Sequence, residues 1–367
     1  MASPVTTPLT SSLATKAAAA RRRQILAWGL GIAALAVFPF MVYPLFAMKV
    51  LCFALFACSF NLLFGFAGLL SFGHAAYFGI ASYVTAESAK YWGLTPELSI
   101  LAGTGVAIVL GAAFGWLAIR RQGIYFSMIT LALAQMVFFF CLQAEFTGGE
   151  DGIQSVPRGD LFGLIPLSSH MAMYYFVMGV FLIGFLIIYR TINSPFGQVL
   201  RAVRDNDIKA TSLGIKTRHV KLAAFVISAG VAGLGGATKA LVFQLASLTD
   251  VSWQASGEAV LMTVLGGAGT LTGPVMGAFI VTGMQQYLAQ FGSWVTIIQG
   301  AIFVVCVLAF RRGIVGELDR LANIPLPWRR AAASPAQATA PARRLERGEG
   351  PGYNVAGRKR QAGAEDG

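Results

Sequence analysis

The sequence predicts an all-α, polytopic membrane protein with about ten transmembrane helices. First, 56% of its 367 residues are hydrophobic and only 12% are charged, whereas soluble domains carry roughly a quarter charged residues. Second, the apolar residues cluster in blocks close to the length of about 20 residues that a helix needs to cross a bilayer core. Third, the basic residues gather in a few segments between these blocks, as they do in cytoplasmic loops.

The apolar blocks give the expected spans in chain order. We expect them near residues 25–46, 49–66, 69–89, 98–118, 124–144, 171–189, 222–243, 256–290 and 293–310. The first block is longer than the apolar core of a signal peptide, so we interpret it as a retained first helix. The block at 256–290 is interrupted by glycines. As two short crossings it gives ten spans, whereas a re-entrant hairpin there would change the number.

The distribution of charge predicts the orientation in the membrane. Residues 1–24 carry four basic and no acidic side chains, and residues 190–221 carry seven basic and two acidic ones. Arginine pairs at 120–121 and 311–312 follow two other blocks. With a cytoplasmic N-terminus and ten crossings, all these segments lie inside, as basic loops should, and the acidic loop 145–170 lies outside. Both termini are then cytoplasmic.

The chain divides into three parts. We expect a cytoplasmic N-terminal segment at 1–24, a transmembrane domain at 25–312, and a cytoplasmic basic tail at 313–367. After about residue 330 the tail has almost no large apolar residues, so we predict that it is largely disordered. Lys239, near the end of a span, is expected to extend its ammonium group outward to the membrane interface.

The loop at 190–221 has the pattern of an amphipathic helix pair. Ser194 and Pro195 are suited to cap and begin a helix, and Gly214 is suited to a helix end or a sharp turn. Such a helix pair could lie on the bilayer surface or dock into a groove of a soluble partner, and the residue pattern favours neither. The sequence has no phosphate-binding loop and no arrangement of catalytic or metal-ligating residues. We therefore predict no enzyme activity, no metal site and no bound cofactor in this chain.

Two glycine-rich segments predict helices that are broken at membrane depth. Dense glycine with Ser, Thr and Pro lets a helix break where the chain lines a cavity, although small residues also serve close helix packing. The motif from Gly65 to Ser71 echoes the motif from Gly266 to Thr272, which is a hint of an internal repeat. The residues expected at the breaks are Gly65, Gly68, Gly73, Gly266, Gly267, Gly269, Gly273 and Pro274.

Five ordered segments carry a resemblance to a known family. They are 68–79, 123–132, 147–153, 201–225 and 266–274, including the run Arg201-Ala202-Val203-Arg204-Asp205-Asn206-Asp207. They resemble the membrane-spanning subunits of ABC importers for branched-chain amino acids, of the LivM type, and the resemblance covers about 25–312. It implies the fold of an ABC importer permease, in the bacterial cytoplasmic (inner) membrane.

This resemblance implies that the loop at 190–221 is the coupling element that rests on an ATPase. The residues that match it are Arg201, Arg204, Asp205, Asp207, Ala210, Leu213 and Gly214. The chain has Ile208-Lys209-Ala210 where other importers have Glu-Ala-Ala, so the contact residues themselves stay open. The implied partners are a second, homologous permease, two cytoplasmic ATPase subunits that bind and hydrolyse ATP, a periplasmic binding protein and the lipid bilayer. No nucleic acid is implied.

The resemblance further implies import of branched-chain or other hydrophobic amino acids, or of urea or short amides. Candidates to line the translocation path are Asn61, Ser71, His74, Glu258 and Thr270. Interhelical packing is the alternative role of Asn61, Ser71 and His74, and a place at the outer interface is the alternative for Glu258. The alternative function is an ion-coupled secondary transporter of small polar or amphipathic solutes. Such a transporter needs charged groups deep inside several spans, and the sequence has few of them. A structural membrane scaffold ranks third, because it would not need glycine breaks.

Overall fold

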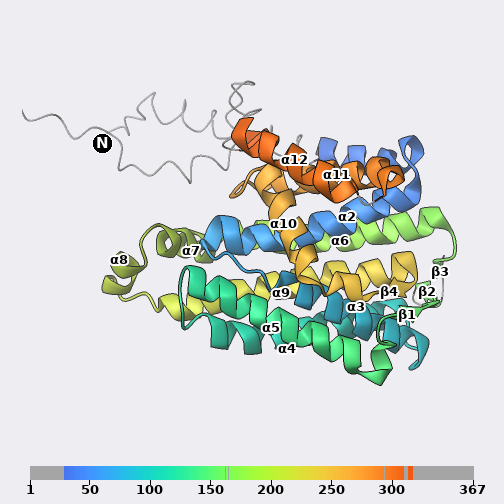
Figure 1. Cartoon of the computed structure of the whole chain (residues 1–367), viewed down its shortest axis with the longest axis horizontal. Coiled ribbons are helices and arrows are strands. Elements are labelled where there is room, and N and C mark those ends of the chain that lie inside the picture. Colours follow the sequence, from blue (N-terminus) through green and yellow to red (C-terminus); the bar gives the residue numbers. More distant parts are fainter. Residues whose placement is uncertain (1–28, 162, 164, 293, 310–312, 317–367) are drawn as a thin grey trace, which may run out of the picture. The chain divides into compact units, whose positions relative to one another are not determined.

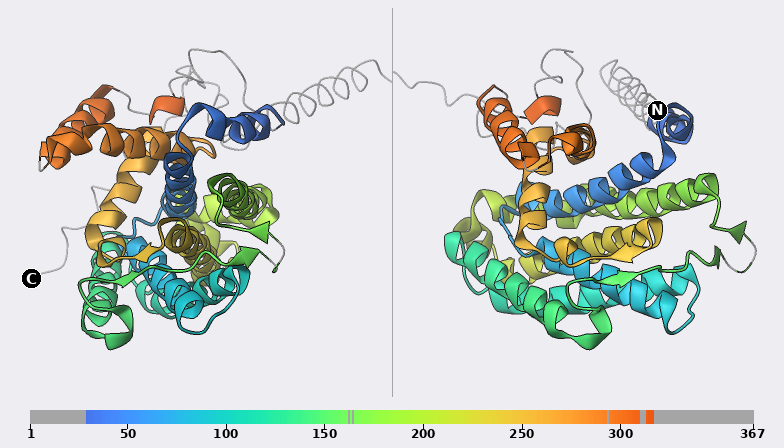
Figure 2. Two further views of the ribbon diagram at one scale, coloured as in Figure 1. Left: turned by 90° about the vertical axis from the view of Figure 1, so that its right-hand side faces the viewer. Right: turned by 45° about the vertical axis from the view of Figure 1, so that its right-hand side comes forward.

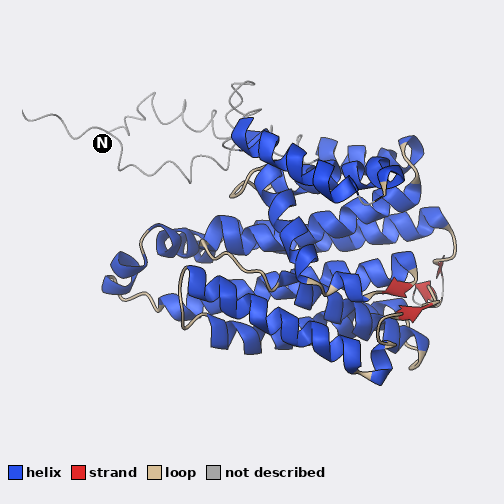
Figure 3. Ribbon diagram, in the orientation of Figure 1, coloured by secondary structure: helices blue, strands red, loops and turns tan. Residues whose placement is uncertain are grey.

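The computed structural model describes residues 29–161, 163, 165–292, 294–309 and 313–316, which are mostly helical (Figures 1 and 3). The predicted segment 1–24 and all but four residues of the predicted tail 313–367 lie outside this part of the chain. The helices are a short apolar helix Gly29–Met41, α2 (Pro44–Asn61), α3 (His74–Lys90), α4 (Pro96–Ala118), α5 (Ile124–Gln143), α6 (His170–Asn193), α7 (Pro195–Asp205), α8 (Asp207–Ser212), α9 (Thr217–Phe243), α10 (Trp253–Gly266), α11 (Gly273–Leu288) and α12 (Trp294–Ala309).

The described residues also form four strands of two residues each and short 3-10 turns at Glu145–Thr147, Leu248–Asp250 and Ala289–Phe291. β1 (Ile153–Gln154) pairs antiparallel with β4 (Leu245–Ala246), and β2 (Asp160–Leu161) pairs antiparallel with β3 (Ile165–Pro166). The first three strands lie in the acidic loop between α5 and α6, and β4 follows α9. The β1–β4 pair therefore ties the acidic loop to the end of α9.

Five helices are long and apolar enough to cross a membrane, by length and composition. They are Pro44–Phe66, which includes a π turn at Leu62–Phe66, and α4, α5, α6 and α9. The other predicted blocks are also helical, but their helices have 17 or fewer residues. The predicted first block is divided, because its helix ends at Met41 and α2 begins at Pro44. Proline is suited to the first turn of a helix and cannot continue one.

Helices α2 and α9 form the centre of the bundle. In the most apolar window of each span, 83% of residues are buried for α2 and 67% for α9, against 28–39% for α4, α5 and α6. Helix α9 packs against α2, α3, α4 and α6, and Figure 2 shows it among these helices. The peripheral helices expose apolar side chains such as Leu101, Val109, Met128 and Leu186, which suits contact with lipid.

Glycines in α9 permit close packing at the centre. A Cβ atom added at Gly236 would overlap the backbone carbonyl of Phe78 on α3, and one at Gly233 would overlap the side chain of Ala107 on α4. Small residues at such crossings let helix backbones approach closely in a membrane. These glycines therefore set the separation of α3, α4 and α9.

The basic loop and the acidic loop lie at opposite ends of the bundle (Figure 1). Helices α7 and α8, which belong to the loop at 190–221, extend from one end, and strands β1 to β4 lie at the other. This separation agrees with the predicted placement of the two loops on opposite sides of a membrane.

Candidate functional site

The first break in the helical structure is residues 67–73, between the π turn and α3. Gly68 has a φ of +72°, which favours glycine. The helix continues through Gly65, so this glycine lies in the π turn rather than in the break itself. The Phe72 N–H donates to Thr130 Oγ1 on α5 at 3.2 Å, and the Ala75 N–H donates to Ser256 Oγ on α10 at 2.9 Å. Side chains from two other helices thus satisfy N–H groups at the start of α3, which lack partners within their own helix.

Ser71 and His74, the predicted path residues beside this break, are both buried. Ser71 Oγ accepts a hydrogen bond from the Gly73 N–H at 3.2 Å. His74 Nε2 lies 2.8 Å from Ser228 Oγ on α9, and its ring packs between Phe60 and Tyr77. In this conformation the two side chains form part of the packing between α2, α3 and α9.

The second break is residues 267–272, between α10 and α11. Gly267 and Gly269 have φ values of +121° and +76°. Thr270 Oγ1 donates to the Gly267 carbonyl at 2.7 Å and accepts from the Gly273 N–H at 3.1 Å. Pro274 follows in the first turn of α11, where its missing N–H costs no hydrogen bond. Thr270 therefore links the two ends of the break and caps α11.

Asn61 connects the two breaks, although they are some 200 positions apart in the sequence. Its Nδ2 donates to the Thr270 carbonyl at 2.7 Å, and its Oδ1 accepts from the Gly269 N–H at 2.9 Å. A Cβ atom on Gly65 would lie 2.8 Å from the Gly269 Cα. The two glycine motifs that echo one another in the sequence therefore lie in direct contact, which sequence reasoning did not predict.

The loop at 190–221 folds as the predicted helix pair. Ser194 Oγ accepts from the Gly197 N–H at 3.4 Å, and Pro195 begins α7. Asn206 separates the two helices and caps α8 through its Oδ1, which accepts from the Lys209 N–H at 2.9 Å. Gly214, with a φ of +84°, ends α8. The predicted helix start at Ser194 and turn at Gly214 are confirmed.

Arg204 attaches this loop to the π turn that precedes the first break. Its Nη1 donates to the Gly65 carbonyl at 2.7 Å, and its Nη2 lies 2.9 Å from Asp205 Oδ1. A Cβ atom on Gly68 would lie 2.7 Å from the Arg204 Cγ, so the arginine stem crosses the break where glycine leaves room. Just after the π turn, the Leu69 N–H donates back to the Leu63 carbonyl inside it, outside the regular α-helical pattern. π turns of this kind occur often at functional sites.

Further contacts hold the loop against the spans. Arg201 donates to the Ile192 carbonyl at 3.3 Å, and its guanidinium carbon lies 5.4 Å from the centre of the Phe66 ring. Asp207 pairs with Lys221 at the start of α9 at 2.8 Å and accepts from Gln122 Nε2 at 2.6 Å. Burial acts to raise the pKa of Asp207, but hydrogen bonds from Lys221 and its other neighbours hold that pKa below its ordinary value.

The tip of the loop presents apolar side chains to solvent. Ile208 and Leu213 are each 81% exposed, whereas Ala210 between them is buried. A Cβ atom on Gly214 would meet no atom within 4 Å. Exposed apolar side chains at the end of a loop are suited to contact with another surface. Ile208 is not among the predicted loop residues, although it is as exposed as Leu213. Its signal in the sequence is an apolar side chain directly after Asp207, the acidic first residue of the short helix α8.

Glu258, the remaining predicted path residue, lies in the second turn of α10, between two residues of that helix that contact α3 and α2. Its Oε1 accepts from Gln285 Nε2 on α11 at 2.9 Å. Close by, Lys239 forms an ion pair with Asp250, and these side chains are only 14% and 7% exposed. The prediction that Lys239 extends outward to the interface is wrong, because a buried carboxylate follows β4 and pairs with it.

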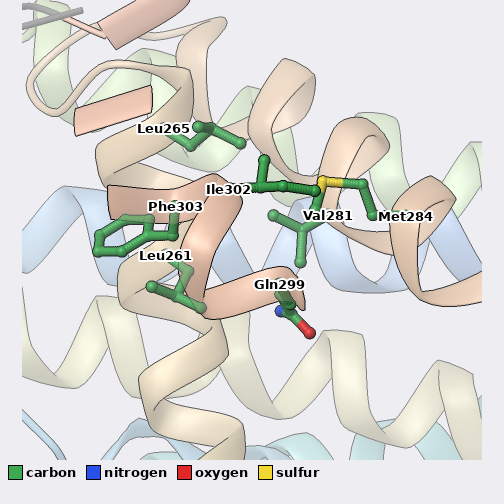
Figure 4. Close-up of a pocket in the computed structure, with 7 residues that line it drawn as sticks. All are labelled: Leu261, Leu265, Val281, Met284, Gln299, Ile302 and Phe303. Carbon is green, nitrogen blue, oxygen red and sulfur yellow. The ribbon is translucent and has the colours of Figure 1, made fainter. Parts of the chain in front are cut away.

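A small hollow lies between α10, α11 and α12 (Figure 4). Its lining residues are Leu261, Leu265, Val281, Met284, Gln299, Ile302 and Phe303. Apart from one amide, all of these side chains are apolar. The hollow therefore offers no charge that could recognise an ionic ligand.

Comparison with known proteins identifies the family. Residues 44–307 match the family model described as "Branched-chain amino acid transport system / permease component". The chain is 25% identical over 278 residues to the high-affinity branched-chain amino acid transport system permease protein LivM of Escherichia coli K12. That match covers 70% of this chain and 65% of LivM, so the chain spans just under two thirds of this relative's length.

Other relatives are similarly distant. The chain is 24% identical to the permease protein LivH of Escherichia coli K12, over 72% of this chain and 91% of LivH. It is 26% identical to a probable LivM of Methanocaldococcus jannaschii, over 65% of this chain and 79% of that protein. No solved structure matches the chain. With the family model covering most of the chain, this protein belongs to the family of permease components of branched-chain amino acid ABC transport systems, which are not catalytic themselves.

Proposed function

We propose that this chain is one of two permease subunits of an ATP-driven importer for branched-chain or other hydrophobic amino acids. Its partners would be a homologous permease, two cytoplasmic ATPases and a periplasmic binding protein that delivers the substrate. The observation that carries the proposal is the bond between Arg204 and the Gly65 carbonyl, which joins the exposed loop to the π turn directly before a break in a membrane-spanning helix.

Ten crossings, with the basic loop in the cytoplasm, account for the path of the chain. Ser256, in the first turn of α10, bonds to the start of α3, and Thr270 beyond α10 bonds to Asn61 at the end of α2. Helix α10 thus runs from the interior of the bundle towards the basic loop. Helix α11 returns, because Phe279 packs on Phe46 near the outer start of α2. The residues after α12 come back to the second break, where Gly313 packs on Gly267.

The coupling step would follow the contacts described above. An ATPase that binds the apolar tip at Ile208 and Leu213 would move α8 and α7 as it closes on ATP. Arg204 would transmit this movement to the π turn through Gly65, and Asn61 would transmit it to the second break. Packed elements switch between discrete arrangements rather than deforming continuously. Both breaks would then change together, which would alternate access to a path between this chain and its partner permease.

The predicted path residues take different roles in this proposal. Asn61 and Thr270 join the two breaks, while Ser71 and His74 pack at the first break, so the four would open or close the path by moving with the breaks. Glu258 is the one that carries a charge for a polar substrate. The residues expected to touch the ATPase are Ile208, Leu213 and Gly214 at the tip.

Uptake by the reconstituted complex tests the proposal against an ion-coupled transporter. The chain, its partner permease and the ATPases would be placed in proteoliposomes, with ATP on the cytoplasmic side and leucine-loaded binding protein on the other. We expect uptake of labelled leucine that requires ATP and continues when ionophores collapse all ion gradients. Uptake that proceeds without ATP and follows an imposed proton or sodium gradient would overturn the proposal in favour of secondary transport.

A further inference from the structure

Four ionisable side chains from four different segments lie within electrostatic range of one another in the half of the bundle away from the basic loop. Lys49 lies in the second turn of α2, Lys239 in the last turns of α9, Asp250 directly before α10, and Glu258 in the second turn of α10. Two positive and two negative charges leave this group neutral overall. Charges at such depth are costly and are retained where they pair with one another or line a hydrated path.

Lys239 and Asp250 fulfil the first of these conditions. They form an ion pair with little exposure, and the Lys239 ammonium also lies 6.0 Å and 5.9 Å from the centres of the Phe78 and Phe243 rings. A buried pair of this kind ties the segment after β4 to α9. Its charges are already compensated within the fold.

Lys49 and Glu258 are not compensated in the same way. Among the residues that the structure describes, Lys49 has no hydrogen-bond or ion-pair partner, and Glu258 uses only Oε1, for Gln285. Neither the Lys49 ammonium nor Glu258 Oε2 is among the enclosed polar atoms that lack a partner, so both keep accessible surface. Next to Glu258, a Cβ atom on Gly257 would meet no atom within 4 Å, so this part of α10 is open on one side. These two charges therefore remain accessible, as side chains that line a path must be.

A positive and a negative charge on two different helices complement a ligand that carries both charges. An ammonium group donates to a carboxylate, and a carboxylate accepts from a lysine, in charge-assisted hydrogen bonds. A ligand with one charge would unbalance the neutral group. A neutral ligand such as urea would leave both side chains without a charged partner. We propose that Glu258 binds the ammonium group, and Lys49 the carboxylate, of one zwitterionic amino acid in the outer half of the translocation path.

This inference rests on the proposed function and adds a substrate-binding site within the permease itself. The competing role for Lys49 and Glu258 is structural, with each charge merely offsetting the other across α2 and α10. The two roles differ in one ratio, the number of leucine molecules imported per ATP hydrolysed. A loss of structure lowers import and ATP hydrolysis together, whereas loss of the binding site lowers import for each ATP that is used.

The test measures this ratio in proteoliposomes that contain the full complex and leucine-loaded binding protein. The variants are Lys49→Met, Glu258→Gln and the double variant, which removes both charges and so leaves no unpaired one. We expect each to lower leucine import per ATP about tenfold, since each loses at least one charge-assisted hydrogen bond to the substrate. Lys49→Arg, which keeps the charge, should retain most of the import.

Lys90→Met is the matched control. It removes a lysine charge at the outer end of α3, where the ammonium group bonds the exposed Gln154 carbonyl, and it should leave the ratio unchanged. A double variant that imports leucine at the wild-type ratio would overturn the inference, as would import and ATP hydrolysis that fall in proportion. Wild-type import of urea or acetamide but not of leucine would overturn the zwitterion as ligand. A wild-type complex whose ATPase does not respond to loaded binding protein would instead refute the proposed function.

Discussion

Replacing Arg204 with methionine should uncouple the loop from the spans while leaving the fold intact. The substitution keeps most of the apolar stem over Gly68 but removes the hydrogen bond to the Gly65 carbonyl. Hydrogen bonds to charged groups contribute about 1.5–3 kcal/mol. The Arg204 side chain is 35% exposed, and solvent weakens such an interaction, so we expect about 1–2 kcal/mol here. A change of this size shifts the balance between two states by roughly 5–30-fold.

The assay for Arg204→Met is the stimulation of ATP hydrolysis by substrate-loaded binding protein in the reconstituted complex. We expect this stimulation to fall by about the factor of 5–30 given above, because movement at one end no longer reaches the other. The apparent melting temperature of the permease in detergent should change little, since the lost bond lies at the edge of the bundle. Gly68→Ala should weaken coupling by a separate route, because its Cβ atom would lie 2.7 Å from the Arg204 Cγ at a position with positive φ.

Asp205→Asn is the control for this experiment. It removes the ion pair of Arg204 but leaves the bond to Gly65, and an exposed ion pair contributes only about 0–1 kcal/mol. Stimulation should therefore stay within about a factor of five of wild type. If Arg204→Met keeps full stimulation, or if Asp205→Asn loses as much as Arg204→Met, Arg204 does not carry the coupling and the reasoning is refuted.

Three further predictions concern the fold and the loop. Asn61→Leu leaves the Gly269 N–H and the Thr270 carbonyl without their partner, which should cost about 1–3 kcal/mol of stability per group. The melting temperature should therefore fall clearly, whereas Asn193→Leu, at an exposed position, should leave the melting temperature unchanged. Gly236→Ala should prevent folding because its Cβ atom would overlap the Phe78 carbonyl, whereas Gly105→Ala, in open space, should give a normal monodisperse peak on size-exclusion chromatography. The lowered pKa of Asp207 stabilises the loop fully above the ordinary carboxyl pKa of about 3.9, and this contribution is lost as pH falls through the lowered value. Hydrogen exchange of residues 195–215, corrected for intrinsic rates, should thus be constant from pH 8 to pH 5 and rise only in stronger acid; a rise near neutral pH would contradict this assignment.

The order of the helices and their approximate ends could be predicted because they depend on local signals. Long apolar blocks mark the spans, and Ser194 with Pro195 marks the start of α7. Pro44 itself is the sequence signal for the division of the first block, because proline begins helices and does not continue them. The apolar residues on both sides of Pro44 nevertheless predict a single helix.

The contacts that make the candidate site depend on long-range packing, which no local pattern encodes. Asn61 has the same sequence environment whether it faces a cavity or bonds to Thr270, so its partner could not be inferred. The π turn at Leu62–Phe66 has no composition that separates it from an ordinary helix. Lys239 looked like a residue at a span end, and its partner Asp250 comes from a segment that folds back against α9.

The central claim is that an ATPase docks on the tip of the basic loop and drives transport through it. The most direct measurement compares ATP hydrolysis, with and without substrate-loaded binding protein, for wild type, Gly214→Arg and Gly93→Arg. Both glycines have positive φ and no atom within 4 Å of an added Cβ, but Gly214 lies at the tip and Gly93 at the opposite end. The account predicts that Gly214→Arg abolishes stimulated ATP hydrolysis and that Gly93→Arg preserves it. Full stimulation in Gly214→Arg, or equal loss in both variants, would contradict it.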